Sequence, residues 1–282
     1  MLDDGVIVER APAKLNLALH VRRRRADGYH DLETLFAFAE DGDTVSVARA
    51  RTDSFAITGP FADALSDSLA DNLVTRAARA FADAFGIAER HAITLDKHLP
   101  VASGIGGGSA DAAATLRSLA RLHGVGATDA RLAAIATRLG ADVPACLLGR
   151  TALGTGRGDA LTPLEPLGGV PALLVNPGVA MSTAAVFAGW DGVDRGAIAY
   201  GSVLDVARAG RNDLQAAALA LAPVVGDMLA CLDAMPGATL VRMSGSGATC
   251  FALFGTAGAC LAAATSLADE RQGWWLLETK LT

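Results

Sequence analysis

Hydrophobic and polar residues alternate over much of the first fifty positions, a pattern typical of β-strands with one buried face. It predicts a strand over 6–21, a polar turn at 25–28 and strands over 34–39 and 44–48. Strands and helices then interleave, which indicates an α+β or α/β fold. The predicted helices cover 72–85, 115–123, 128–139 and 213–221, with a helix start at 183–188, and the later strands cover 172–175, 238–243 and 249–254.

A segment rich in glycine and proline, 148–169, separates two stretches of regular pattern and predicts a domain boundary. We expect an N-terminal domain over 1–155 and a C-terminal domain over 156–282. The 282 residues, 51% of them hydrophobic, suffice for a large core, and the length alone suits one large domain or two modest ones.

Composition narrows the function classes. A net charge of −6 disfavours a broad electrostatic surface for nucleic acid. No apolar run reaches the length of a membrane span, and the acidic N-terminus does not resemble a signal peptide, so we expect a cytoplasmic protein. The cysteines are scattered without a C-x-x-C pair, and we expect reduced, packed thiols at Cys146, Cys231, Cys250 and Cys260.

The segment 99–114 joins four glycines to the start of a predicted helix. Glycine allows the backbone to approach a ligand closely, and a helix N-terminus offers unpaired N–H groups, so the pattern favours phosphate binding. Ser109 is a suitable N-cap and Asp111 suits the positive end of the helix dipole. The run is neither a Walker A loop nor a G-x-G-x-x-G fingerprint, and an ordinary glycine-rich turn remains the alternative.

Polar residues at two further places are candidates for chemistry. In the first predicted strand the odd-numbered positions from 13 to 21 are apolar, so Lys14 and Asn16 share the opposite face, either a solvated surface or a site. Asp142 stands among apolar and small residues and needs a cationic partner if it is buried. Its alternative role is a helix cap, because Pro144 suits the first turn of a new helix.

Two other segments stand out. The glycine-rich connection 244–248 joins two predicted strands and is either a hairpin turn or a second phosphate-facing loop. The basic run from Arg22 to Arg25 is either a solvated hairpin edge or a device that assists capture of a polyanionic substrate.

In this order the pieces resemble the GHMP kinase superfamily of small-molecule kinases. The resemblance spans nearly the whole chain and rests on segments 12–17, 99–114 and 244–249. Segments 25–36 and 140–144 resemble, more narrowly, the members that phosphorylate 4-diphosphocytidyl-2-C-methyl-D-erythritol in the non-mevalonate isoprenoid pathway. The resemblance implies an α+β fold of two domains: an N-terminal ATP-binding domain of ribosomal-protein-S5-like type and a C-terminal ferredoxin-like α/β sandwich.

The resemblance also implies roles for individual residues. Asp142 would be the catalytic base, and Lys14 would orient it and neutralise charge on the transferred phosphoryl group. Both roles suit phosphoryl transfer, which depends mainly on positioning and electrostatics. ATP would arrive with Mg²⁺, without a dedicated protein cage for the metal. The implied ATP-binding residues are Asn72, Lys97, Pro100, Ser103, Gly104, Ile105, Gly106, Gly107, Gly108 and Ser109.

On the acceptor side, the resemblance implies that Tyr29, His30 and Phe187 enclose the cytosine, with His30 hydrogen-bonded to its edge. An aromatic face together with a few polar groups is what a pyrimidine needs. The implied substrate-binding residues are Asn16, Tyr29, His30, Phe36, Thr183, Phe187, Gly245 and Ser246. We expect the diphosphocytidyl alcohol and ATP as ligands, and no nucleic acid, membrane or obligate protein partner.

The sequence departs from the family pattern at Ala102 and Ser103, where glycines are commoner, and at Ile105, where leucine is usual. Three alternative functions remain at this point. They are a superfamily kinase for mevalonate, homoserine or a sugar, a catalytically silent nucleotide-binding regulator, and a dinucleotide-binding oxidoreductase. The last fits poorly, because its glycine loop would follow the leading strand.

Overall fold

The structure is a computed structural model that describes residues 5–282, without the side chains of 66–68 and 70. The chain forms two compact units. Unit 1 holds the described residues up to Ala13, Asp41–Val101 and Gly106–Gly149, and unit 2 holds Lys14–Glu40, Ala102–Ile105 and Arg150–Thr282. The predicted boundary between residues 155 and 156 stays a prediction.

Two long, paired strands, β1 (Ile7–Arg24) and β2 (His30–Ala50), each contribute residues to both units. The sequence predicted β2 as two separate strands. The predicted turn between β1 and β2 is confirmed, with a backbone hydrogen bond from Gly28 N to Arg25 O.

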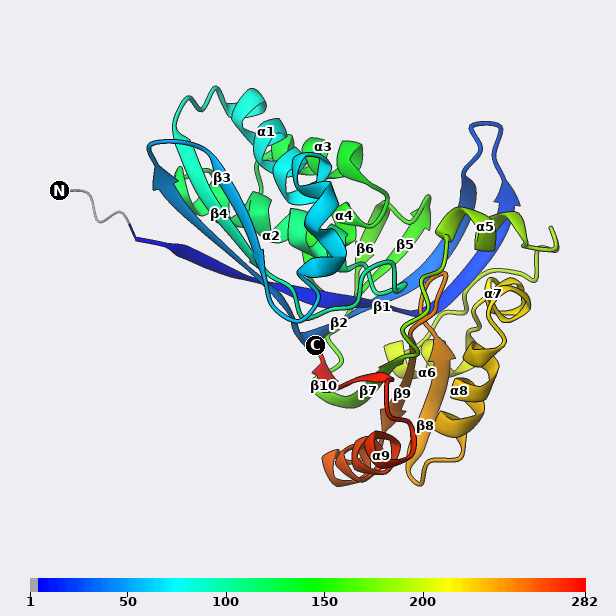
Figure 1. Ribbon diagram of the computed structural model, residues 1–282. Coiled ribbons are helices and arrows are strands. Elements are labelled where there is room, and N and C mark those ends of the chain that lie inside the picture. Colours follow the sequence, from blue (N-terminus) through cyan, green and yellow to red (C-terminus); the bar gives the residue numbers. More distant parts are fainter. Residues whose placement is uncertain (1–4) are drawn as a thin grey trace. The chain divides into compact units, whose positions relative to one another are not determined.

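Unit 1 combines a sheet with a layer of helices (Figure 1). The second half of β2 pairs antiparallel with β4 (Arg90–Asp96), which pairs parallel with β3 (Ser54–Thr58). Buried and less buried side chains alternate along the second half of β2 and along β4, so one face of these strands is buried. The helices of this unit are η1 (Asp63–Asp71), α1 (Leu73–Phe85), α2 (Gly107–Leu122), α3 (Ala130–Leu139) and α4 (Val143–Leu148).

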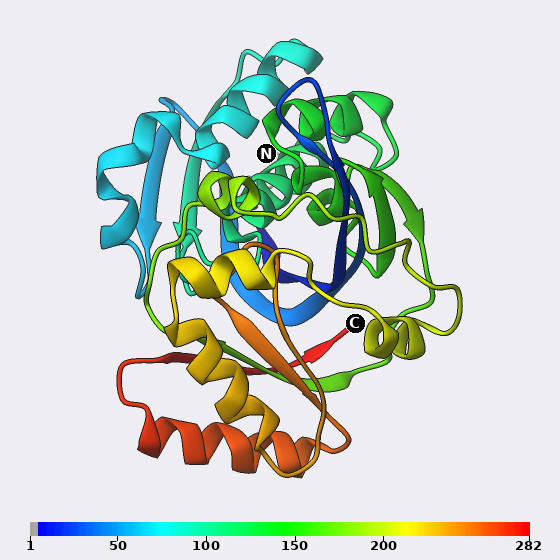
Figure 2. The same ribbon diagram turned by 90° about the vertical axis from the view of Figure 1, so that its right-hand side faces the viewer.

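The C-terminal half of unit 2 contains an antiparallel sheet in the order β10-β7-β9-β8. Its strands are β7 (Val170–Asn176), β8 (Ala238–Met243), β9 (Cys250–Phe254) and β10 (Trp275–Leu281). Helices α8 (Val224–Asp233) and α9 (Ala257–Glu270) share one apolar core with this sheet and cover one face of it (Figure 2). If α5, α6 and α7, which precede α8, are set aside, the chain order is strand, helix, two strands, helix and strand, which is the predicted ferredoxin-like pattern.

The rest of unit 2 surrounds the paired ends of β1 and β2. Strand β5 (Ala152–Gly156) pairs with β2 and with β6 (Ala160–Pro163). These two strands lie in the segment that the sequence analysis assigned to a glycine-rich boundary. A Cβ on Gly154 would lie 2.7 Å from Cε2 of Phe36, so glycine here lets β5 approach β2. The remaining helices are α5 (Thr183–Ala188), α6 (Val203–Ala209) and α7 (Gln215–Leu221).

The prediction that Ser109 caps a helix is wrong. Helix α2 begins at Gly107, and its N-cap is Gly106, whose φ of 65° is the left-handed conformation that glycine adopts readily. Ser109 is therefore the third helical residue. Among the described residues, every helix is too short or too polar to span a membrane.

Candidate active site

Lys14 and Asn16 are buried side by side on β1, with exposed fractions of 2% and 3%. The alternative of a solvated outer face is therefore wrong. Lys14 Nζ donates to Asn16 Oδ1 at 2.9 Å, and Asn16 Nδ2 donates to Thr34 Oγ1 at 2.7 Å. Lys14 Nζ also lies 5.4 Å from the ring centroid of Phe36, which is buried as well. The amide and the aromatic ring thus orient a desolvated ammonium group, which suits an anionic ligand.

Two segments singled out by their glycines meet within unit 2. Ser244 Oγ donates to Gly104 O at 3.1 Å and accepts from Asn16 N at 3.2 Å. A Cβ on Gly104 would lie 2.6 Å from the carbonyl oxygens of both Ser244 and Gly247. A Cβ on Gly245 would lie 2.7 Å from Gly104 O. Only glycine fits at these two positions, so the contact between the segments gives a reason for these glycines besides the approach of a ligand or a turn.

Side chains hold this second glycine segment in place. Asn212 Nδ2 donates to Met243 O and Gly245 O, both at 2.8 Å. The hydroxyl groups of Thr183 and Ser246, two predicted substrate-binding residues, lie 3.1 Å apart. This role of Asn212 was not predicted, because a lone asparagine before a helix indicates no more than a turn.

In unit 1, the first turn of α2 presents backbone N–H groups. Gly107, Gly108 and Ser109 are the first three residues of a 16-residue helix, so their N–H groups have no acceptor within it. These donors and the positive end of the helix dipole form an arrangement that binds phosphate. Gly108 is exposed and carries no side chain to obstruct a ligand.

Lys97 and Asp111 form a buried cluster with Asp43 directly behind this turn. Lys97 Nζ donates to Asp43 Oδ2 at 2.5 Å and to Asp111 Oδ2 at 2.8 Å, and a Cβ on Gly107 would lie 3.1 Å from Nζ. Burial raises the pKa of Asp111 to about 7, against the opposing charge of Lys97. The Lys97 ammonium is thus engaged by two carboxylates, and its ATP-binding role stays a prediction.

Asn72 and Asp142 both stand at the N-termini of helices in unit 1, but they use their side chains differently. Asn72 Oδ1 accepts from Val74 N at 2.9 Å and caps α1. Asp142 is half-buried and occupies the N-cap position of α4. Its carboxylate accepts no capping hydrogen bond from the N–H groups of that helix. Pro144 lies in the first turn, as predicted. The Asp142 carboxylate therefore does not cap the helix.

His30 lies against two aromatic rings in unit 2. Its ring centroid is 5.0 Å from that of Phe187, at an interplanar angle of 36°, and 5.7 Å from that of Trp190, at 83°. Within the described residues, His30 Nε2 and Trp190 Nε1 are buried and lack hydrogen-bond partners. Unsatisfied buried polar atoms are costly, so these two atoms are candidates for contact with a ligand.

Burial and, next, the positive charge of Arg24 lower the pKa of His30. The imidazole is therefore neutral at neutral pH. Tyr29, predicted to help enclose the base, is 53% exposed, and the guanidinium of Arg157 lies 5.1 Å from its ring centroid. The sequence analysis missed Trp190, whose only signal was a large aromatic residue three positions after Phe187.

The four arginines of the basic run all have partners. Arg22 pairs with Glu33 and Asp194, and Arg24 donates to two backbone carbonyls. On the other face of the strand, Arg23 and Arg25 both pair with Asp31. These contacts hold the hairpin to its neighbours and favour a structural role over capture of the substrate.

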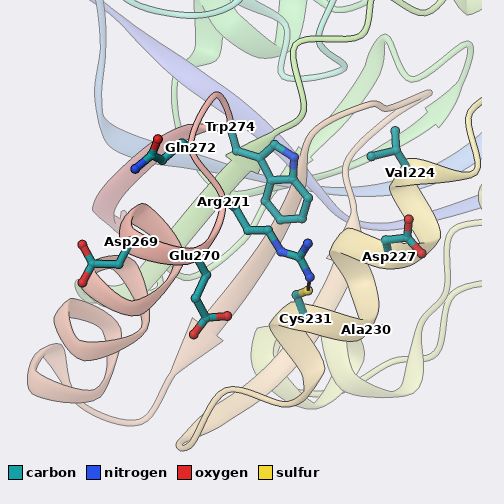
Figure 3. A pocket seen from close by; sticks show the side chains of 9 residues that line it. All are labelled: Val224, Asp227, Ala230, Cys231, Asp269, Glu270, Arg271, Gln272 and Trp274. Atoms are coloured by element: carbon teal, nitrogen blue, oxygen red, sulfur yellow. Dashed lines mark hydrogen bonds between the residues drawn. The ribbon is translucent and has the colours of Figure 1, made fainter.

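A separate groove of unit 2, of about 740 Å³, lies between α8 and the segment that follows α9 (Figure 3). Arg271 crosses it and donates to Cys231 Sγ at 3.2 Å. None of the predicted site residues lines this groove.

Comparisons with known proteins agree with this geometry. The GHMP kinases N terminal domain matches residues 72–150, and the GHMP kinases C terminal domain matches 199–269. A 4-diphosphocytidyl-2-C-methyl-D-erythritol kinase of Rhizorhabdus wittichii is 56% identical over 97% of this chain and 94% of its own length. The protein of that name from Novosphingobium aromaticivorans is 51% identical over 88% of this chain and 84% of its own length.

Among solved structures, a 4-(cytidine 5'-diphospho)-2C-methyl-D-erythritol kinase is 34% identical with a TM-score of 0.79, over 98% of this chain and 99% of that one. The family models and the relatives together exclude the alternative of a dinucleotide-binding oxidoreductase. The chain belongs to the GHMP kinase family.

Proposed function

We propose that the chain transfers the γ-phosphoryl group of ATP to the 2-hydroxyl group of 4-diphosphocytidyl-2-C-methyl-D-erythritol, a step of non-mevalonate isoprenoid synthesis. Relatives that are 45–56% identical carry the name of this kinase. The structural observation that carries the proposal is His30 Nε2, a buried polar atom without a partner beside the Phe187 ring. A cytosine would supply both a flat face for Phe187 and a polar edge for His30.

The proposed reaction needs a base and a cation. The Asp142 carboxylate accepts the proton of the 2-hydroxyl group while the hydroxyl oxygen forms a bond to the γ-phosphorus, and the bond to the bridging oxygen of ADP breaks. Lys14 orients the base and neutralises charge on the transferred group. Support for Lys14 comes from its burial and its bond to Asn16, which fix the direction of the ammonium. Support for Asp142 comes from its carboxylate, which α4 does not use as a cap.

ATP phosphates would bind to the backbone N–H groups of Gly106–Ser109. The first turn of α2, which has no side-chain cap, supports this assignment. Mg²⁺ would enter with the phosphates and neutralise part of their charge. Side chains at Asn72 and Lys97, and the residues Pro100, Ser103, Gly104 and Ile105, stay predicted contributors to the ATP site.

On the acceptor side, we assign Asn16, Thr183, Gly245 and Ser246 to contacts with the diphosphate and the alcohol. The paired hydroxyl groups of Thr183 and Ser246 support this assignment, because one donates to the other and the second keeps its proton for a phosphate oxygen. Tyr29 would add a second aromatic face for the base, and Phe36 would act through Lys14.

A substrate comparison tests the proposal. The purified protein, with ATP and Mg²⁺, receives 4-diphosphocytidyl-2-C-methyl-D-erythritol, 2-C-methyl-D-erythritol 4-phosphate, homoserine or mevalonate, and release of ADP is followed. The proposal expects turnover with the first acceptor and a kcat/KM at least about 100-fold lower with the second, which lacks the cytidine group. Equal turnover of the first two, or a preference for homoserine or mevalonate, would contradict it.

A further inference from the structure

The segment that carries Phe187 and Trp190 shares an apolar core with β1 and is also hydrogen-bonded to the end of that strand through Arg24. Helix α5 ends at Ala188, and the carbonyl groups at the end of a helix lack N–H donors within it. Arg24 Nη2 donates to Ala188 O at 3.0 Å and to Trp190 O at 2.8 Å. A cation at this position also interacts favourably with the negative end of the helix dipole.

The two carbonyl groups that Arg24 reaches lie next to both rings that touch His30. Trp190 N donates to Phe187 O at 3.2 Å, so the two aromatic residues belong to one tight turn. Figure 1 shows α5 beside the hairpin formed by the end of β1 and the start of β2, where His30 begins β2. Arg24 therefore connects the strand next to His30 with the turn that bears its aromatic neighbours.

The neighbouring arginines make different contacts from those of Arg24. Arg22, two residues before Arg24, reaches Glu33 and Asp194, and Glu33 accepts from Ile198 N at 2.7 Å. The alternate residue Arg23 faces the other way, is 76% exposed along its side chain and pairs with Asp31. Arg23 thus offers a matched control with the same charge.

We propose, on the basis of the function proposed above, that Arg24 is a positioning residue for the nucleobase. Its two hydrogen bonds hold the turn at Phe187 and Trp190 against His30, and so shape the pocket that recognises the cytosine. Arg24 acts on the base through these residues and touches neither the base nor the phosphates.

The charge of Arg24 supports the same role. Together with burial it keeps His30 neutral, so that one ring nitrogen carries a proton and the other accepts a hydrogen bond. A neutral imidazole matches the neutral edge of a cytosine.

Binding measurements on Arg24→Gln, Arg24→Lys and Arg23→Gln test the proposal. We expect Arg24→Gln to raise the Kd of both cytidine and cytidine 5′-diphosphate by the same factor, roughly 10-fold, as the loss of hydrogen bonds from a charged donor implies. Arg24→Lys, which keeps the charge and several donors, recovers part of the loss. Arg23→Gln leaves both Kd values within about twofold of the parent, as expected for an exposed ion pair.

Two results would overturn the proposal. Unchanged Kd values in Arg24→Gln would show that the turn keeps its place without the two hydrogen bonds from Arg24. A loss confined to cytidine 5′-diphosphate would show that Arg24 contacts a phosphate directly.

An NMR measurement separates this proposal from the proposed function. In the parent, we expect nuclear Overhauser effects between the His30 ring protons and the indole of Trp190, whose centroids lie 5.7 Å apart, with assignments from His30→Asn and Trp190→Phe. We expect these signals to weaken in Arg24→Gln and to persist in Arg23→Gln, with or without ligand. If the parent binds no cytidine compound, the proposed function fails, while the signals still decide whether Arg24 positions the rings.

Discussion

The ammonium group of Lys14 donates a 2.9 Å hydrogen bond to the side-chain oxygen of Asn16, two residues further along the same buried face of β1. A strand places alternate residues on one face, so the backbone itself brings the two side chains together. The amide fixes the direction of a charge that water does not stabilise. This relationship suits the proposed role of Lys14 as the cation that meets the transferred phosphoryl group.

Replacement of Lys14 by methionine tests that role. Methionine keeps the length and removes the charge, so we expect kcat to fall by about 10²–10³-fold, as for other groups that stabilise charge in a transition state. Steady-state kinetics with the diphosphocytidyl acceptor measure the effect, and thermal unfolding confirms that the variant is folded. A kcat within fivefold of the parent would remove Lys14 from the proposed mechanism.

Gly104 should be intolerant of a side chain for two separable reasons. Its φ is 78°, and a Cβ would lie 2.6 Å from two backbone oxygens. Gly28 has a φ of 84°, and a Cβ added there would meet no atom within 4 Å, so Gly28→Ala reports the conformational cost alone. We expect Gly28→Ala to cost about 1–2 kcal/mol and Gly104→Ala to cost more. Equal losses in denaturant unfolding would show that the two glycine segments do not touch.

Ala102 has a φ of 52°, the one left-handed residue other than glycine in the described part of the chain. The sequence analysis noted that glycine is commoner here. We expect Ala102→Gly to stabilise the protein by about 0.5–1 kcal/mol, because the relief of strain exceeds the entropic cost of glycine. The control Ala262→Gly, on an exposed face of α9, should instead destabilise by about 1 kcal/mol. Urea unfolding of both variants measures the signs, and a loss of stability in Ala102→Gly would contradict the strain.

Asp111 should make stability depend on pH. Burial raises its pKa from 3.8 to about 7 in the folded protein. Between these two values the folded state binds more protons than the unfolded state, so the stability that this group contributes is lost progressively as the pH rises from the lower value to the higher. Asp111→Asn cannot ionise, and its stability relative to the parent should therefore improve as the pH is raised from 5 to neutrality.

The difference between the unfolding free energies of the parent and Asp111→Asn, followed from pH 5 to pH 8, measures this effect. It should change up to about the folded-state pKa and stay level above it. A difference that stays constant throughout would show that Asp111 is ionised over the whole range, and a change in the opposite direction would contradict the raised pKa.

The two glycine segments were predicted as loops from the sequence, but the contact between them was not. Their composition predicted both loops and their place beside strands or helices. Their mutual contact, through Ser244 Oγ and Gly104 O, joins residues 140 positions apart, and no local pattern reports such a distance. The same limit applies to Lys97, whose partners Asp43 and Asp111 are 54 and 14 residues away.

Prediction from local propensity was also wrong where tertiary packing decides the structure. Strands β5 and β6 lie in a segment whose glycines and prolines indicate turns, and the close approach of Gly154 to Phe36 shows why tertiary packing prevails there. By contrast, the amphipathic helices α1 and α3 were predicted nearly at their observed bounds, because periodicity and capping residues agree. Trp190 carries no periodic signal, and its contact with His30 emerges only from the fold.

The measurement that tests the account most directly is ATP-dependent phosphorylation of 4-diphosphocytidyl-2-C-methyl-D-erythritol by the parent and by Asp142→Asn. Asp129→Asn is the matched control, since Asp129 caps α3 and asparagine caps equally well. We predict turnover by the parent and the control, and a kcat about 10²–10⁴-fold lower in Asp142→Asn, the range for loss of a general base. Turnover by Asp142→Asn at the rate of the parent would contradict the proposed mechanism, and no turnover by the parent would contradict the proposed function.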